Sequence, residues 1–181
     1  MLIIFAVVQL TFVNHQQKRR DYIGMVRNRG IDMARYSKIV VAVDLSNESA
    51  AIVEKALEVA PGDAELHLIY VQEPMDSVYL GVVPYGPVFV GMDQVEGRLR
   101  KELEDNLKGL GERFGVPEQH QHFVNGNPAK EIHRFVKSND INLIVMGTHG
   151  QKGVQLLLGS TANSVLHGAS CDVLAVRVLD E

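Results

Sequence analysis

Apolar, β-branched runs alternate with helix-like segments from Lys38 to Val178, and this alternation limits the possible folds more than any other feature. The runs are KIVVAV, AELHLIYV, HQHFV, INLIVMG and CDVLAVRV. The nearly unbroken apolar character of KIVVAV and INLIVMG is typical of strands covered on both faces. Because helical patterns separate the runs, the sequence predicts an α/β, Rossmann-like fold. It would be a single open five-stranded parallel sheet with right-handed crossovers and helices on both faces.

Four segments carry helix signals. SNESAAIVEKALEVA has Ser46 as a candidate N-cap, with Ser49 and Ala50 opening the helix. NPAKEIHRFVKSND has Asn127 as its cap and Pro128 in its first turn. MDQVEGRLRKELEDNLKGLGERFG predicts a long amphipathic helix with a solvated charged face and i,i+4 ion pairs. STANSVLHGA predicts the fourth helix.

Residues 1–32 differ from the rest of the chain. MLIIFAVVQLTFV is an apolar run of thirteen residues, whereas a membrane span needs about 20. The positive charges follow this run, whereas a secretory signal carries them in front. Five basic and two acidic residues give the segment a charge of +3, so the remainder of the chain, whose total is −4, carries −7. We interpret residues 1–32 as an N-terminal extension, disordered or left untranslated in the cell, and residues 33–181 as the folded domain.

Charge and cysteine content narrow the functional classes. A net charge of −4 argues against a general nucleic-acid-binding protein, which needs a basic face. We also expect no membrane partner. The single cysteine, Cys171, has no internal disulfide partner, which favours a reducing, cytoplasmic location. Cys171 is expected to be a small apolar residue before the last strand, and the alternative is a reactive thiol.

Glycine and hydroxyl residues mark a candidate binding site. Gly147 and Gly150 follow the INLIVM run, and Gly159 stands directly before Ser160 and Thr161 at the start of a helix. Ligands of parallel sheets bind beyond the carboxyl ends of the strands, where the winding direction reverses, and helix N-termini attract phosphate. These residues therefore suit a phosphate-binding loop. They suit an ordinary connection with a serine N-cap equally well, and the sequence contains neither a Walker motif nor a dinucleotide-binding motif.

Several segments, in their order and spacing, carry a family resemblance. KIVVAVDLSNES opens the domain, LHLIYV lies in the second strand, GTHG follows the fourth, and LLLGSTANSVL and CDVLAVRV close the domain. Together they resemble the universal stress protein family over residues 37–178. The resemblance implies a five-stranded fold and a dimer formed through the last strand. It also implies, for one branch of the family, ATP binding by the motif G-x2-G-x9-G-[ST].

The resemblance implies a set of ATP-binding residues, with magnesium or manganese as an accompanying ion. They are Ala42, Val43 and Asp44 beside the adenosine, Val71 at the adenine, and Met146, Gly147, His149, Gly150, Gly159, Ser160 and Thr161 around the ribose and phosphates. The sequence departs from the motif at one point, since the eight residues QKGVQLLL separate Gly150 from Gly159 where the motif has nine. Asp44 also has an alternative role as a turn residue before the first helix.

We therefore expect a stress-response protein that binds ATP and acts as a dimeric switch or signalling module. Its dimer would form through residues Asp172 to Val178, and its protein partner is not identifiable from the sequence. Residues 72–91 form a long loop rich in proline and glycine, which ATP binding could order. Two alternatives stay open: an interaction module without nucleotide, and an enzyme that hydrolyses ATP slowly or transfers an adenylyl group. We assign no catalytic residue, because the candidate site lacks paired carboxylates and an evident base.

A few other residues could carry chemistry. His120 and His122 in HQHFV would share one face of a strand, a geometry that can bind a metal. Since no further ligand is near them in the sequence, we expect two exposed histidines and no metal site. His149 could be a general acid or base, or could simply contact phosphate. Lys152 could reach a terminal phosphate or be solvated.

Overall fold

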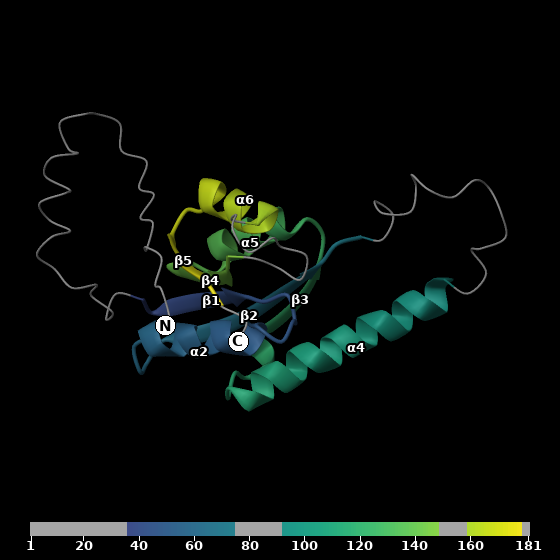
Figure 1. The fold of residues 1–181 in the computed structure, drawn as a ribbon. Helices are drawn as coiled ribbons and strands as arrows, with labels where there is room; N and C mark the ends of the chain where they lie inside the picture. The colour runs from purple at the N-terminus through teal and green to yellow at the C-terminus, as the bar shows by residue number, and fades with distance from the viewer. Residues whose placement is uncertain (1–35, 75–91, 149–158, 179–181) are drawn as a thin grey trace, which may run out of the picture.

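The computed structural model describes residues 36–74, 92–148 and 159–178, which are drawn in colour in Figure 1. The extension expected at residues 1–32 lies outside this part of the chain, as does most of the loop expected at residues 72–91. Among the described residues, no helix is both long enough and apolar enough to cross a membrane.

Five parallel strands form one sheet in the order β3-β2-β1-β4-β5 (Figure 1). Their bounds are Lys38–Ala42 for β1, Glu65–Gln72 for β2, Gln121–Asn125 for β3, Leu143–Gly147 for β4 and Asp172–Val176 for β5. The predicted open parallel α/β sheet is therefore confirmed. The chain winds outward from β1 to β3 and then returns to place β4 on the other side of β1, so the winding direction reverses between β1 and β4.

Helices cover both faces of the sheet, as the unbroken apolar runs of its central strands predict. Their bounds are Ser49–Val59 for α2, Met92–Arg113 for α4, Pro128–Ser138 for α5 and Ser160–Gly168 for α6, with a short 3-10 helix, η3, at Glu118–His120. Figure 1 shows α2 and α4 on one face and α5 and α6 on the other. Neighbouring residues of β1 consequently enter two different cores, Val41 with α2 and α4 and Val40 with α5 and α6.

The structure confirms the predicted N-cap of α5 and corrects the predicted N-cap of α2. The Asn127 side chain accepts a hydrogen bond from the Lys130 amide at 3.1 Å and caps α5, with Pro128 at its first position, as predicted. Ser46 is not the N-cap of α2, which begins at Ser49 as expected but after Glu48. The Ser46 hydroxyl instead donates to Asp44 Oδ1 at 2.6 Å, so the neighbouring carboxylate takes the group that would have capped the helix.

The long helix α4 has the solvated charged face that its sequence predicts. Arg100 pairs with Glu104 at 2.8 Å, four residues further along the exposed surface. Gly97 and Gly109, which lower the helix propensity, lie within α4 without interrupting it. The opposite face supplies Leu107 to the core, so burial of an apolar stripe supports the helix.

A buried hydrogen bond ties the first described residue to the last strand. The Tyr36 hydroxyl donates to Asp172 Oδ2 at 2.9 Å, and both residues are buried, at 4% and 9% exposure. Removing the donor leaves a buried carboxylate oxygen with one bond fewer, which is costly inside a protein.

We expect Tyr36→Phe to lower the free energy of unfolding by about 1–3 kcal/mol, because the phenol donates to a buried charged group. Urea denaturation followed by circular dichroism measures the change. Tyr70→Phe is the matched control, since Tyr70 is only half-buried and should lose less. Equal effects of the two substitutions would contradict the importance of the bond to Asp172.

Candidate functional site

A cavity of about 590 Å³ opens at the carboxyl ends of β1, β2 and β4, where the winding direction of the sheet reverses. Its volume lies within the range of about 300–1,000 Å³ found for small-molecule and cofactor sites. Apolar side chains from three helices form part of its wall: Ile52 of α2, Leu99 and Leu103 of α4, and Ile132 of α5. The polar part of the wall comes from the strand ends and from the start of α6.

The structure gathers most of the residues that the sequence singled out around this cavity. Lining residues include Ala42, Val43, Asp44, Val71, Met146, Gly147, Gly159, Ser160 and Thr161. His149 and Gly150 lie outside the described residues, as do Lys152 and the eight-residue segment 151–158. Sequence reasoning missed Leu99 and Leu103, although their i,i+4 spacing on α4 is a sign of an apolar helix face.

The two ends of the glycine-rich segment meet at the cavity. The Gly159 amide donates to the Thr148 carbonyl at 2.8 Å, and the Thr148 amide donates to the Val176 carbonyl at 2.9 Å. The exit of β4 and the start of α6 are thus bonded to each other and fixed to β5. Gly159 is the N-cap of α6 and supplies no side-chain acceptor, so the first amides of the helix carry no side-chain cap.

Asp44 has a defined structural role beside the cavity. Its Oδ1 accepts hydrogen bonds from the Ser46 amide at 3.0 Å, from the Ser46 hydroxyl at 2.6 Å and from the Ser49 hydroxyl at 3.0 Å. The backbone bends at Leu45, whose φ of 59° lies in the left-handed region. The carboxylate therefore organises the turn into α2, as an aspartate often does, and at the same time lines the cavity.

Tyr70 brings a phenol to the same cavity. Burial raises the pKa of its hydroxyl, and the negative charges of Asp44 and Glu73 raise the pKa further. The phenol consequently stays protonated at neutral pH and can donate a hydrogen bond to a ligand. The described wall thus combines apolar surface, the carboxylates of Asp44 and Glu73, a phenol and the start of a helix.

Comparison with known proteins extends these observations. The model of the family described as "Universal stress protein family" matches residues 35–177. The chain is 42% identical to universal stress protein A homolog 2 of Coxiella burnetii over 149 residues, which cover 81% of this chain and 98% of the relative. The chain belongs to the universal stress protein family. It is also 35% identical to universal stress protein MJ0531 of Methanocaldococcus jannaschii, over 78% of this chain and 82% of the relative.

A solved structure supports the fold of this family member. Universal stress protein UspA from Lactobacillus plantarum aligns with a TM-score of 0.56 and 23% identity, covering 79% of this chain and 99% of that protein. This similarity supports the arrangement of strands and helices, including the order of the strands in the sheet.

The prediction of two exposed histidines is wrong in this universal stress protein. His120 ends the short helix η3, and 22% of its side chain is exposed. His122 lies in β3 and packs against Phe135 of α5, with ring centroids 4.4 Å apart. The HQH segment therefore spans the end of a 3-10 helix and the start of a strand, and neither histidine is a free surface group.

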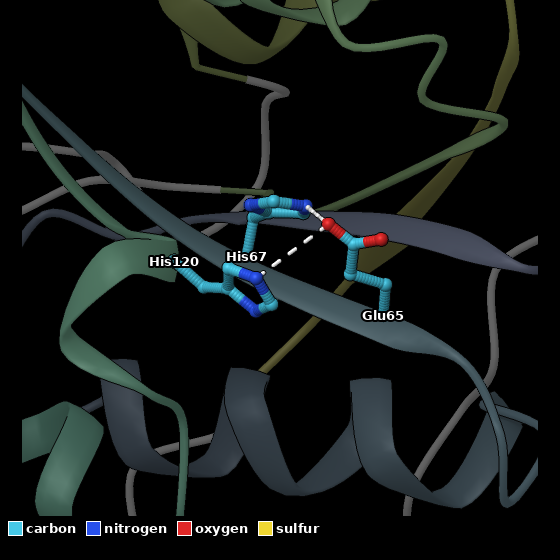
Figure 2. A group of neighbouring side chains, drawn as sticks. All are labelled: Glu65, His67 and His120. Atoms are coloured by element: carbon cyan, nitrogen blue, oxygen red, sulfur yellow. Dashed lines mark ion pairs between the residues drawn. The ribbon is translucent and has the colours of Figure 1, made fainter.

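Further titratable side chains lie beside these two histidines. β2 and β3 are neighbours with Ile69 opposite His122, so the start of β2 faces η3. His67 Nδ1 lies 3.1 Å from His122 Nε2, and Glu65 Oε1 lies 3.6 Å from His120 Nε2 (Figure 2). The expectation of no metal site considered only ligands near in the sequence, whereas Glu65 and His67 come from a strand more than fifty residues earlier.

Cys171 directly precedes β5, as the sequence predicts, and packs against the core formed with α5 and α6. Burial and, to a smaller extent, the charge of Asp172 raise the pKa of its thiol to about 11, against the opposing effect of a backbone hydrogen bond at Ile144. At neutral pH the sulfur is therefore a protonated apolar group, in agreement with a packing role.

We expect native Cys171 to react with iodoacetamide at pH 8 about 100-fold more slowly than in the unfolded chain, because only the thiolate reacts and its fraction is suppressed. The rate should rise roughly tenfold per pH unit up to the raised pKa of about 11. Mass spectrometry of quenched samples, with the chain in guanidinium chloride as reference, measures both rates. Similar rates in the two states would show that the thiol is reactive.

Proposed function

We propose that this family member is a stress-response protein that binds ATP and acts as a cytoplasmic binding module or switch. The observation that carries the proposal is the hydrogen bond between Gly159 and Thr148, because it brings the exit of β4 and the uncapped start of α6 together at the cavity. Helix N-termini of this kind attract phosphate through their amides and their dipole. The resemblance to the ATP-binding branch of the family makes Gly159 the last glycine of its motif, preceded by eight residues in place of nine.

Different parts of the cavity wall suit the adenine, the ribose and the phosphates of ATP. The adenine would lie against Val43 and Val71 and against the apolar side chains of α4. The Asp44 carboxylate, held in place by Ser46 and Ser49, would accept a hydrogen bond from the ribose. The phosphates would lie at Gly159, Ser160 and Thr161, accompanied by magnesium or manganese.

A binding role suits this wall better than an enzymatic one. Among the described lining residues, the acidic groups are Asp44 and Glu73, and histidine and lysine are absent. Oδ1 of Asp44 already accepts three hydrogen bonds from Ser46 and Ser49, so this oxygen is engaged in the turn before α2. ATP hydrolysis at this site would accordingly be slow or would depend on a partner.

The proposal predicts that Gly159→Val abolishes ATP binding, with at least a 100-fold loss of affinity, because the valine side chain fills the space at the start of α6 where phosphate would approach. Isothermal titration calorimetry with Mg-ATP measures the affinity. Gly62→Val is the matched control, since Gly62 lies in a turn away from the cavity and a Cβ there meets nothing within 4 Å. Unchanged affinity of Gly159→Val would refute the site.

Two further results would replace the proposal. If an acid extract of the purified protein contains no adenine nucleotide and Mg-ATP causes no thermal shift, the chain is an interaction module without nucleotide. If the purified protein turns over ATP within minutes, it is an enzyme. ATP that remains intact for hours while bound supports the switch.

We also propose that the protein forms a twofold dimer through β5 and the residues that follow it, Asp172 to Val178. β5 lies at one edge of the sheet, bonded to β4 on one side, and its strand-forming residues are mostly buried. An apolar edge strand of this kind is usually covered or paired. Light scattering should give a mass near twice 20.0 kDa, and a purely monomeric mass over a wide concentration range would contradict the dimer.

A further inference from the structure

Three side chains converge at the amino end of β2, opposite to the edge that holds the cavity. Glu65 and His67 lie two residues apart on β2 and point to the same face of the sheet, and His120 reaches them from η3 (Figure 2). Glu65 Oε1 lies 2.9 Å from His67 Nε2 and 3.6 Å from His120 Nε2. One ligand atom from each residue lies within 4.8 Å of the other two.

The two distances from Glu65 to the histidines are close to the spacing of ligands around a small metal ion. Zinc binds imidazole nitrogen and carboxylate oxygen at about 2.0–2.2 Å, so two ligand atoms of a tetrahedral site are about 3.3 Å apart. The two distances to Glu65 Oε1 lie on either side of this value. Two histidines and one glutamate also form a known zinc ligand set, with a further position for water.

A nitrogen of this cluster is buried without a hydrogen-bond partner. The His67 side chain is 7% exposed, and its Nε2 is a buried polar atom for which the described residues supply no hydrogen-bond partner. Glu65 Oε1 is close to this nitrogen, but the contact does not have the geometry of a hydrogen bond. A buried polar atom without a partner is costly, and a metal ion between nitrogen and oxygen would satisfy both.

The other nitrogen of His67 is already oriented. His67 Nδ1 lies 3.1 Å from His122 Nε2, and the Phe135 ring packs against both imidazoles. When Nδ1 donates its proton to His122, Nε2 keeps its lone pair toward Glu65 and His120. Metal-binding histidines are commonly held by such a second hydrogen bond, which fixes the ring and its tautomer.

Zinc coordinates neutral imidazoles and a carboxylate, which are the groups that these three residues supply. The nearby ammonium of Lys38 is bonded to the Asn139 carbonyl at 3.3 Å, at the end of α5.

We propose that Glu65, His67 and His120 bind a divalent transition-metal ion, best matched by zinc, through Glu65 Oε1 and Nε2 of each histidine. The ion would join η3 to β2 and so fix the connection between α4 and β3. Glu65 is 40% exposed, which gives the ion access from solvent and leaves room for a water ligand. The site is separate from the cavity and does not rest on ATP binding.

Zinc titration of the full chain tests the site. The protein is first freed of metal with a chelator, and it is then titrated without nucleotide in competition with a chromophoric chelator. We expect one zinc ion per chain bound with an affinity that Glu65→Gln and His120→Ala each weaken by about tenfold or more. His122→Gln should weaken binding by about 10–100-fold, because it removes the orienting partner of His67. Zinc should also raise the melting temperature of the wild type and not that of Glu65→Gln.

His167→Ala is the matched control, because His167 is an exposed histidine on α6 whose Nδ1 lies 2.8 Å from the Asn163 carbonyl, away from the cluster. It should leave zinc affinity unchanged. Should His120→Ala fail to fold, Glu65→Gln still decides, since it is nearly isosteric and partly exposed. Zinc affinity that is the same in the wild type, Glu65→Gln and His120→Ala, or no stoichiometric binding at all, would overturn the proposal and leave an ion-pair cluster.

Discussion

The parallel pairing of β1 with β4 is the contact on which the rest of the structure depends. Ile39 faces Leu143 and Ala42 faces Met146 across this pair, and the valines at its centre have no exposed surface. Each such side chain contributes about 1.5–3 kcal/mol through burial. The reversal of winding occurs at the same pair, so the contact that anchors both cores also separates the helices at one end of the sheet. The cavity exists because those helices diverge there.

The two ends of the sheet present different chemistry for a simple reason. At the carboxyl ends, strands lead into helix starts, which offer amides, hydroxyls and a positive dipole end. At the amino ends, strands are entered from helix ends and turns, and the polar groups available are side chains. In this protein those side chains are two imidazoles and a carboxylate beside His122. An anion is therefore suited to one end and a cation to the other.

The sequence was sufficient for the features that depend on local periodicity and chain order. The strands and the helix cap at Asn127 follow from their residues, and the gathering of Asp44, Gly147 and Gly159 follows from their positions at strand ends and helix starts. The histidine cluster could not be predicted in this way. It arises from the register between β2 and β3, which brings together residues 55 positions apart.

The prediction of Ser46 as the N-cap of α2 was wrong for a different reason. Ser46 and Ser49 both lie within reach of the Asp44 carboxylate, and both hydroxyls donate to it. Several short polar residues thus offer competing caps within a few positions, because their side chains can bond to neighbouring groups in more than one way. Local propensity gives no ranking among them.

The central strand pair also has a consequence for how the chain is made. The Lys38 amide bonds to the Asn142 side chain across 104 residues, whereas β2 follows β1 within about 25 residues. Contacts between residues so far apart in the sequence form slowly, because the intervening chain must first lose conformational entropy. During synthesis β1 therefore leaves the ribosome with one edge unpaired until β4 emerges, a stage at which chaperones protect nascent chains from strand-to-strand aggregation. The cavity needs β4 and the start of α6 for its wall, so it is among the last features of the fold to be completed.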